Sequence, residues 1–218
     1  MSNLSLMWQS FPLLLKGFLI TLEIAVMVAT MGIFLGTLVG LGRTSGKGWL
    51  SGTLRVYVEV MRGTPLYTQL LLVCFGLPVA LDIQFDTFTA AVLTMGVNSS
   101  AYVSEIIRAG IQSIDKGQME AARSMGMSHS QAMLYVILPQ AIKRVIPPLL
   151  NEIIALIKES SLIGALALVE LTRTAQLIAS RTYRPFPAYL GAALIYLVTV
   201  LVLSQFTAWL ERRLRASD

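Results

Sequence analysis

Cysteine, histidine and charge are scarce in this 218-residue chain, and each shortage excludes a class of protein. The single cysteine, Cys74, rules out a disulfide within the chain and a cysteine-rich metal site. The single histidine, His129, rules out a histidine-based metal centre. Charged residues make up only 13% of the chain, against about a quarter in an average soluble domain. With 55% hydrophobic residues, the composition is that of a multi-span membrane protein.

A phosphate-binding loop of the form GxxxxGK[ST] is also missing from the sequence, so we expect no ATP hydrolysis by this chain. We likewise expect the chain itself to bind no cofactor and no metal ion. The net charge of +5 does not call for a nucleic-acid partner, because the cytoplasmic loops of membrane proteins are rich in lysine and arginine.

Apolar runs of roughly 20 residues, the length that a helix needs to cross a bilayer, recur along the chain. They predict an all-α integral membrane protein with five transmembrane helices in a single domain, 1–218. The expected spans are 17–41, 56–77, 87–107, 149–168 and 188–210.

Two of these spans carry further signals. In the first, Gly32, Gly36 and Gly40 recur at every fourth residue, which predicts a face for close packing against another helix. In the second, Pro65 removes a helical hydrogen bond and predicts a kink or a break. Just before it, Glu59 and Arg62 are spaced to form a pair on one helical face.

Polar residues inside the third and fourth spans must face a protein interior, because a charge at the bilayer centre costs about 2.5–3.5 kcal/mol even on the lower scales. The third span contains Asn98. The fourth contains Glu152, Lys158, Glu159 and Ser160. These groups either line a path for a polar solute or form an internal network that only holds helices together.

The distribution of basic residues predicts the orientation in the membrane. If the polar interval 115–140 is cytoplasmic, the N-terminus lies outside and the C-terminus inside. The inner side then holds most of the lysine and arginine residues: Arg43, Lys47, Arg55, Arg108, Lys116, Arg123, Lys143, Arg144, Arg212, Arg213 and Arg215. The outer side holds Lys16, Arg173, Arg181 and Arg184.

The interval 115–140 is the only long polar stretch between apolar runs. Asp115 can cap a first helix, and Gly126 is suited to end it. A second short helix is expected over 128–136, ending near Pro139 because proline disfavours helix before it.

This interval resembles the "EAA" loop of the inner-membrane subunits of ABC importers. Glu120, Ala121 and Ala122 are followed at the family's spacing by Gly126, and then by the run Val136-Ile137-Leu138-Pro139. The family usually has isoleucine where this chain has Val136. The alternative is an ordinary amphipathic surface helix.

The resemblance implies the type I ABC importer transmembrane fold and a role for the loop as a coupling helix. Such a helix docks on a cytoplasmic ATPase dimer, which binds the ATP and Mg²⁺. Small residues would allow close approach, and charged residues would make contacts at the rim. The coupling residues are then Glu120, Ala121, Ala122, Arg123 and Gly126.

The segment Arg62-Gly63-Thr64-Pro65-Leu66 resembles the polar amino-acid branch of the family. That implies a bacterial inner-membrane subunit paired with a second copy or a homologous permease and fed by an external solute-binding protein. The substrate would be a polar amino acid, with Asn98 and Glu152 as first choices for ligand contacts and Lys158 and Ser160 behind them. Glu152 tilts the expectation towards a basic or broadly polar substrate.

Three other classes compete with this interpretation. A secondary transporter could use Glu152 and Glu159 as proton sites. An ion channel would leave the loop 115–140 unexplained. An intramembrane enzyme would need a catalytic arrangement that the sequence does not offer.

Overall fold

The computed structural model describes residues 3–44, 48–83 and 86–215, and every element in them is helical. Lys47, one of the basic residues counted for orientation, lies outside the described residues. The helices are α1 (Asn3–Thr44), α2 (Gly48–Gly63), α3 (Leu66–Leu71), α4 (Leu77–Leu81), α5 (Thr87–Gln112), α6 (Lys116–Ser124), α7 (His129–Ala132), α8 (Leu138–Glu159), α9 (Leu171–Thr182) and α10 (Pro185–Arg215). Three turns of other helix types join them: π-helical η1 (Leu72–Gly76) and η2 (Met133–Ile137), and the 3₁₀ turn η3 (Ser160–Leu166).

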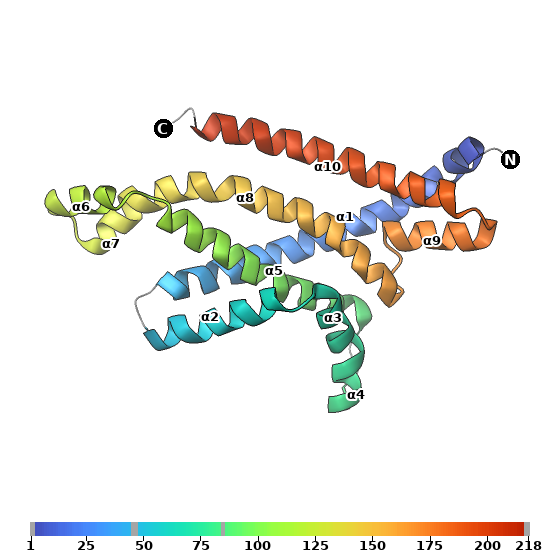
Figure 1. Ribbon diagram of the computed structural model, residues 1–218, viewed down its shortest axis with the longest axis horizontal. Coiled ribbons are helices and arrows are strands. Elements are labelled where there is room, and N and C mark those ends of the chain that lie inside the picture. The colour runs from blue at the N-terminus through green and yellow to red at the C-terminus, as the bar shows by residue number, and fades with distance from the viewer. Residues whose placement is uncertain (1–2, 45–47, 84–85, 216–218) are drawn as a thin grey trace.

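Most of the long helices run along the long axis of the molecule (Figure 1). The N-terminus and α9 lie at one end, and α6, α7 and the C-terminus lie at the other. The segment α3–η1–α4 projects away from this bundle.

The interface between α1 and α5 confirms the predicted glycine face. A Cβ added at Gly36 would lie 2.6 Å from Val103 Cβ and 2.7 Å from the Ser100 carbonyl oxygen. At Gly32 it would lie 2.7 Å from Ser99 Oγ. The missing side chains let the two backbones approach, which buries the small polar residues of α5.

The predicted break in the second span is also confirmed. Between α2 and α3 the chain bends by 100°. Pro65 occupies the N-cap of α3 in an extended conformation, with φ −63° and ψ 132°, and donates no hydrogen bond there. The helix that follows then widens into the π turn η1.

By length and apolar composition, two helices of the described part of the chain can cross a membrane, in the stretches Ser5–Thr44 and Pro185–Leu214. A third span results if α2 and the bent segment after it count as one. Helix α1 begins at Asn3, well before the predicted start of the first span at residue 17, and it includes Pro12.

The fourth predicted span, 149–168, differs more from the structure. Helix α8 begins at Leu138, passes Pro147 and Pro148, and ends at Glu159, where the 3₁₀ turn η3 takes over. A main core of aliphatic side chains, among them Ile24, Met95, Leu156 and Ile163, joins α1, α5, α8 and η3.

Candidate functional site

The loop between α5 and α8 begins with the predicted helix. The Asp115 carboxylate accepts a hydrogen bond of 2.7 Å from the Gly117 N–H and caps α6. At the other end Gly126 has φ +88°, a left-handed conformation that glycine adopts without strain. The Gly126 N–H donates to the Arg123 carbonyl and the Met127 N–H to the Ala122 carbonyl, which is the pairing of a Schellman motif.

The second helix of the loop begins as predicted but does not end at Pro139. Ser128 caps α7 in a reciprocal capping box with Gln131. The helix then continues through the π turn η2 into α8. In the π turn the Leu138 N–H donates to the Met133 carbonyl, and Pro139 falls in the first turn of α8, where a missing donor costs nothing. The prediction of a stop near Pro139 was therefore wrong.

The loop has its own small core, which decides which coupling residues face outward. Ala122 is buried, and Ile114, Ile137 and Ala141, which lie at the two ends of the loop, form a buried cluster against which Met119 packs. The small size of Ala122 therefore suits packing inside the protomer, and Ala122 does not face outward. Of the predicted coupling residues, Glu120, Ala121, Arg123 and Gly126 are exposed, and the neighbouring Met125 is exposed as well. Met125 is 87% exposed.

Two neighbouring residues of α5, Asn98 and Ser99, make hydrogen bonds to different helices in the interior. The Ser99 hydroxyl donates a hydrogen bond of 3.0 Å to the Glu152 carboxylate on α8. The Asn98 amide donates to the Met61 carbonyl oxygen at 3.0 Å and to Gln69 Oε1 at 2.9 Å. The structure thus places Glu152 against α5 and places Asn98 at the break between α2 and α3.

Gln69 was missed by sequence reasoning, although it completes this break. Its amide donates to the Met61 carbonyl oxygen at 3.0 Å and to Thr64 Oγ1 at 2.6 Å. The Met61 carbonyl has no helical partner because the residue four positions on is Pro65, which lacks an N–H. Gln69 and Asn98 donate to it instead. The sequence signal that could have identified Gln69 is its position, four residues after the helix-breaking Pro65.

The other predicted ligand residues lie at the end of α8. Lys158 and Glu159 are exposed on the protomer surface. Ser160 is fully buried, and its hydroxyl donates to the Ile157 carbonyl oxygen at 2.8 Å. The structure does not bring these three residues to Asn98.

A cluster of charges lies towards the α6–α7 end. Glu105 pairs with Arg43 at 2.5 Å and with Arg108, as the spacing within α5 allows. The bond to Glu105 raises the pKa of the Arg108 guanidinium. Glu59 pairs with Arg55 at 2.8 Å.

The predicted Glu59–Arg62 pair is therefore wrong, because an arginine one turn earlier on α2 takes the carboxylate. Arg62 instead lies over the Tyr102 ring, 5.2 Å from its centroid. These charged groups and Tyr102 line a polar cavity of about 760 Å³.

A second buried carboxylate, Glu170, was not singled out from the sequence. It caps α9 by accepting from the backbone N–H groups of Thr172 at 2.8 Å and Arg173 at 2.7 Å. Hydroxyl groups of Thr21 on α1 and Tyr196 on α10 donate to it as well. Burial raises the pKa of the Glu170 carboxyl, and these hydrogen bonds act in the opposite direction.

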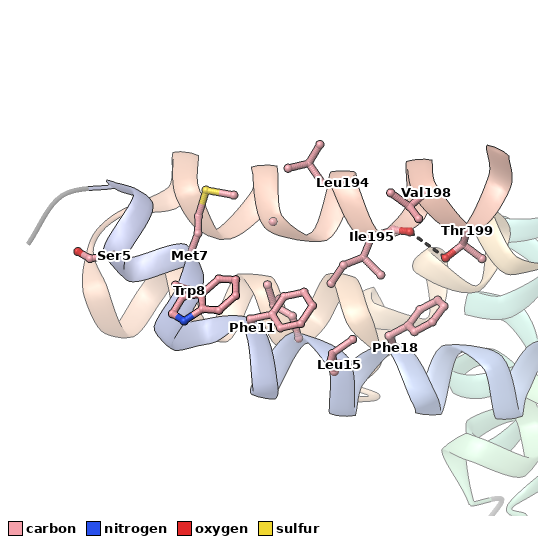
Figure 2. A pocket seen from close by; sticks show the side chains of 12 residues that line it. Ser5, Met7, Trp8, Phe11, Leu15, Phe18, Leu194, Ile195, Val198 and Thr199 are labelled. Carbon is pink, nitrogen blue, oxygen red and sulfur yellow. Dashed lines mark hydrogen bonds between the residues drawn. The ribbon is translucent and has the colours of Figure 1, made fainter. Parts of the chain in front are cut away.

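Another hollow of the surface is of a different kind. A groove of about 860 Å³ lies between the N-terminal part of α1 and the first half of α10. Side chains such as Phe11, Phe18 and Leu194 line it (Figure 2). No described residue that lines it is charged. The hydroxyl of Thr199 is already used, because it donates to the Ile195 carbonyl oxygen. The groove therefore suits apolar groups and not a polar solute.

The helical fold and the exposed, capped loop agree with what comparison with known proteins shows. Residues 32–216 match the model of the family described as binding-protein-dependent transport system inner membrane component, and the chain belongs to that family. It is a permease, the non-catalytic transmembrane subunit of an ABC importer.

Individual relatives are similar over nearly the whole chain. The glutamine transport system permease protein GlnP of Escherichia coli (strain K12) is 41% identical over 213 residues, which are 97% of each chain. The arginine transport system permease protein ArtQ of Bacillus subtilis (strain 168) is 42% identical over 207 residues, 95% of this chain and 94% of that one.

Solved structures agree with these relatives. The crystal structure of an amino acid ABC transporter with histidines superposes with a TM-score of 0.93 at 44% identity, covering 98% of this chain and 99% of that one. An inward-facing MetNI methionine ABC transporter, at 20% identity and a TM-score of 0.79 over 94% and 98% of the two chains, shares the fold.

Proposed function

We propose that this chain is the membrane-spanning subunit of an ATP-driven uptake system for a polar amino acid. The observation that carries the proposal is the exposed α6–α7 loop in a member of the binding-protein-dependent transport family. Relatives at 41–42% identity are named for glutamine and arginine, which supports an amino-acid substrate with a polar side chain.

The proposal includes five spans in a bacterial inner membrane, with the N-terminus outside and the C-terminus in the cytoplasm. Helices α5 and α8 complete the five, because their polar residues lie against other helices and need not meet lipid. The termini lie at opposite ends of the molecule, and the C-terminus shares an end with α6 and α7 (Figure 1). The basic residues near the ends of α1, α5 and α10 favour a cytoplasmic position for that end: Arg43, Arg108, Arg212, Arg213 and Arg215.

The energy for transport comes from ATP hydrolysis by a partner of the permease. A cytoplasmic ATPase dimer binds ATP and Mg²⁺ and docks on the exposed face of the α6–α7 loop, where Ala121 allows close approach and Glu120 and Arg123 supply charge. Gly126 shapes the loop, and Ala122 is buried inside it. An external solute-binding protein delivers the substrate at the α9 end.

The translocation path lies between this chain and a second copy or a homologous permease, because one protomer leaves Lys158 and Glu159 exposed on its surface. Glu152 is the central ligand residue of the path. Asn98 supports the site by holding the bend between α2 and α3. Lys158 contributes charge from the protomer surface, and Ser160 shapes the end of α8.

The test is uptake by proteoliposomes that contain the permease with its ATPase, supplied with the binding protein and radiolabelled L-glutamine or L-arginine. We expect import of at least one of them only when ATP is present with the ATPase. A proton gradient alone should drive none. Import by the permease without the ATPase, driven by the gradient, would instead identify a secondary transporter that uses Glu152 and Glu159.

A further inference from the structure

The polar cavity of about 760 Å³ holds more positive than negative charge. Its lining comes from α1, α2 and α5, and the charged residues described there are Arg43, Arg55, Arg62, Arg108, Glu59 and Glu105. Four guanidinium groups against two carboxylates leave two positive charges in excess. A confined surplus of one sign attracts a ligand of the other sign, so this cavity suits an anion.

The ion pairs within the cavity show where this surplus lies. Glu105 on α5 is shared by two arginines, because Arg43 of α1 and Arg108 both donate to its carboxylate. The Arg43 side chain is only 11% exposed, so a net positive charge is held largely away from water. Such a charge is costly to keep there unless an anion lies nearby.

The second surplus charge belongs to Arg62, since Glu59 pairs with Arg55. Arg62 takes part in none of the ion pairs found between described residues. Its guanidinium lies over the Tyr102 ring, 5.2 Å from the ring centroid, which orients the group without neutralising it. A guanidinium held in this way can still present its N–H donors, whose fork matches the oxygens of a phosphate group.

Under the proposed orientation, the cavity lies at the cytoplasmic side of the membrane. Arg43 and Arg108 are close to the ends of α1 and α5 that lie with α6 and α7 (Figure 1). Trp49, in the first turn of α2, is 75% exposed, and tryptophan is typical of the head-group level of a bilayer. The cytoplasmic leaflet carries acidic lipids, and basic pockets between transmembrane helices on that side bind acidic head groups.

We propose that this cavity binds the phosphate group of an acidic phospholipid of the cytoplasmic leaflet, with Arg62, Arg43 and Arg108 as its cationic ligands. The inference rests on the proposed function only for the orientation in the membrane. Neither Asn98 nor Glu152 lines the cavity, so the site is separate from the predicted contacts of the transported solute. A head group there would contact α1, α2 and α5 at once and tie their cytoplasmic ends together.

The experiment measures binding to the delipidated permease–ATPase complex by native mass spectrometry. The probes are phosphatidylglycerol and phosphatidylcholine with the same acyl chains, which differ in net charge, and sn-glycerol 3-phosphate as a soluble source of the phosphate group. The variants are Arg62→Gln and Arg62→Lys. The matched control is Arg212→Gln, which removes an exposed arginine near the same end of the molecule, on α10 and outside the cavity.

We expect the wild-type complex to bind phosphatidylglycerol about tenfold more tightly than phosphatidylcholine, a difference of the size of one charge-assisted hydrogen bond. Arg62→Gln should remove most of this preference. Arg62→Lys should keep part of it, because the charge remains and the fork of donors is lost. Arg212→Gln should leave the preference unchanged.

Equal binding of the two lipids by the wild-type complex would overturn the inference, and so would an equal effect of Arg62→Gln and Arg212→Gln. Binding of glycerol 3-phosphate that depends on Arg62, without a preference for phosphatidylglycerol, would overturn the lipid assignment in favour of a soluble anion.

A second measurement covers the case in which the Arg62 variants do not assemble. Phosphatidylglycerol should protect Arg62 of the wild-type complex from modification by phenylglyoxal and leave Arg212 reactive, and an unprotected Arg62 would contradict the proposal. These readouts do not involve import. Failure of the proposed function, which is scored by uptake, is therefore distinguishable from failure of the lipid site.

Discussion

At the scale of single residues, Glu170 shows how one buried carboxylate can tie three helices together. It caps α9 and accepts hydroxyl hydrogen bonds from α1 and α10, and it is fully buried. A buried apolar cluster that includes Leu14, Leu171 and Ala188 packs α9 against the ends of the same two long helices. A carboxylate with several donors is stable where an unpaired one would not be.

We predict that Glu170→Ala destabilises the protein by about 2 kcal/mol or more, because it removes a helix cap and leaves buried hydroxyl groups without an acceptor. The thermal unfolding midpoint of the purified complex should fall by about 4–8 °C. Asp82→Asn is the control, since Asp82 is exposed in a turn with φ 52°, which asparagine tolerates. An unchanged midpoint for Glu170→Ala would contradict the role assigned to this carboxylate.

The residues that sequence reasoning found and those it missed differ in their surroundings. Asn98 and Glu152 were identified because a polar group inside an apolar run must face protein. Gln69 also lies inside a predicted span, 56–77, but that span was interpreted only as broken at Pro65, without asking which side chain satisfies the break. Glu170 lies between predicted spans, where an acid needs no explanation. Their functions come from contacts with residues far away in sequence, such as Thr21, which no local pattern reports.

At the scale of helices, the contact between α1 and α5 depends on missing side chains. We predict that Gly36→Ala destabilises the protein by about 1–3 kcal/mol, because its Cβ would overlap Val103 and the Ser100 carbonyl. Gly52→Ala is the matched control: no atom lies within 4 Å of its added Cβ, and alanine favours helix by about 0.5–1 kcal/mol. Thermal unfolding of both variants checks this, and a Gly36→Ala complex as stable as Gly52→Ala would refute it.

The sequence predicted the positions of helices and of the break at Pro65 better than it predicted where each helix ends. The spacing of Gly32, Gly36 and Gly40 and the position of Pro65 each act locally, and both predictions were confirmed. Pro139 was misread because the π turn before it shifts the hydrogen-bond pattern, so the proline falls where no donor is needed. None of the local patterns used in the sequence analysis predicts a π turn at this position.

At the scale of the whole molecule, the protomer has a polar interior, an apolar groove and an exposed loop at one end. Under the proposed function, the loop transmits force from the ATPase to the rest of the protomer. The chain belongs to a family of inner-membrane transport components, and the loop presents Ala121 and the 87% exposed Met125 to the outside. Docking there and rocking of two protomers would alternately open the path to either side.

The most direct test of this account measures substrate-driven ATP hydrolysis and amino-acid import by complexes that carry Ala121→Arg or Ala121→Ser. Ala121 is preferable to Gly126 as the altered position, because Gly126 has a positive φ and any substitution there would strain the loop itself. We predict that the arginine variant folds and binds substrate normally but loses import and stimulated hydrolysis at least tenfold, while the serine variant keeps both. Import by the arginine variant at the wild-type rate would contradict the account.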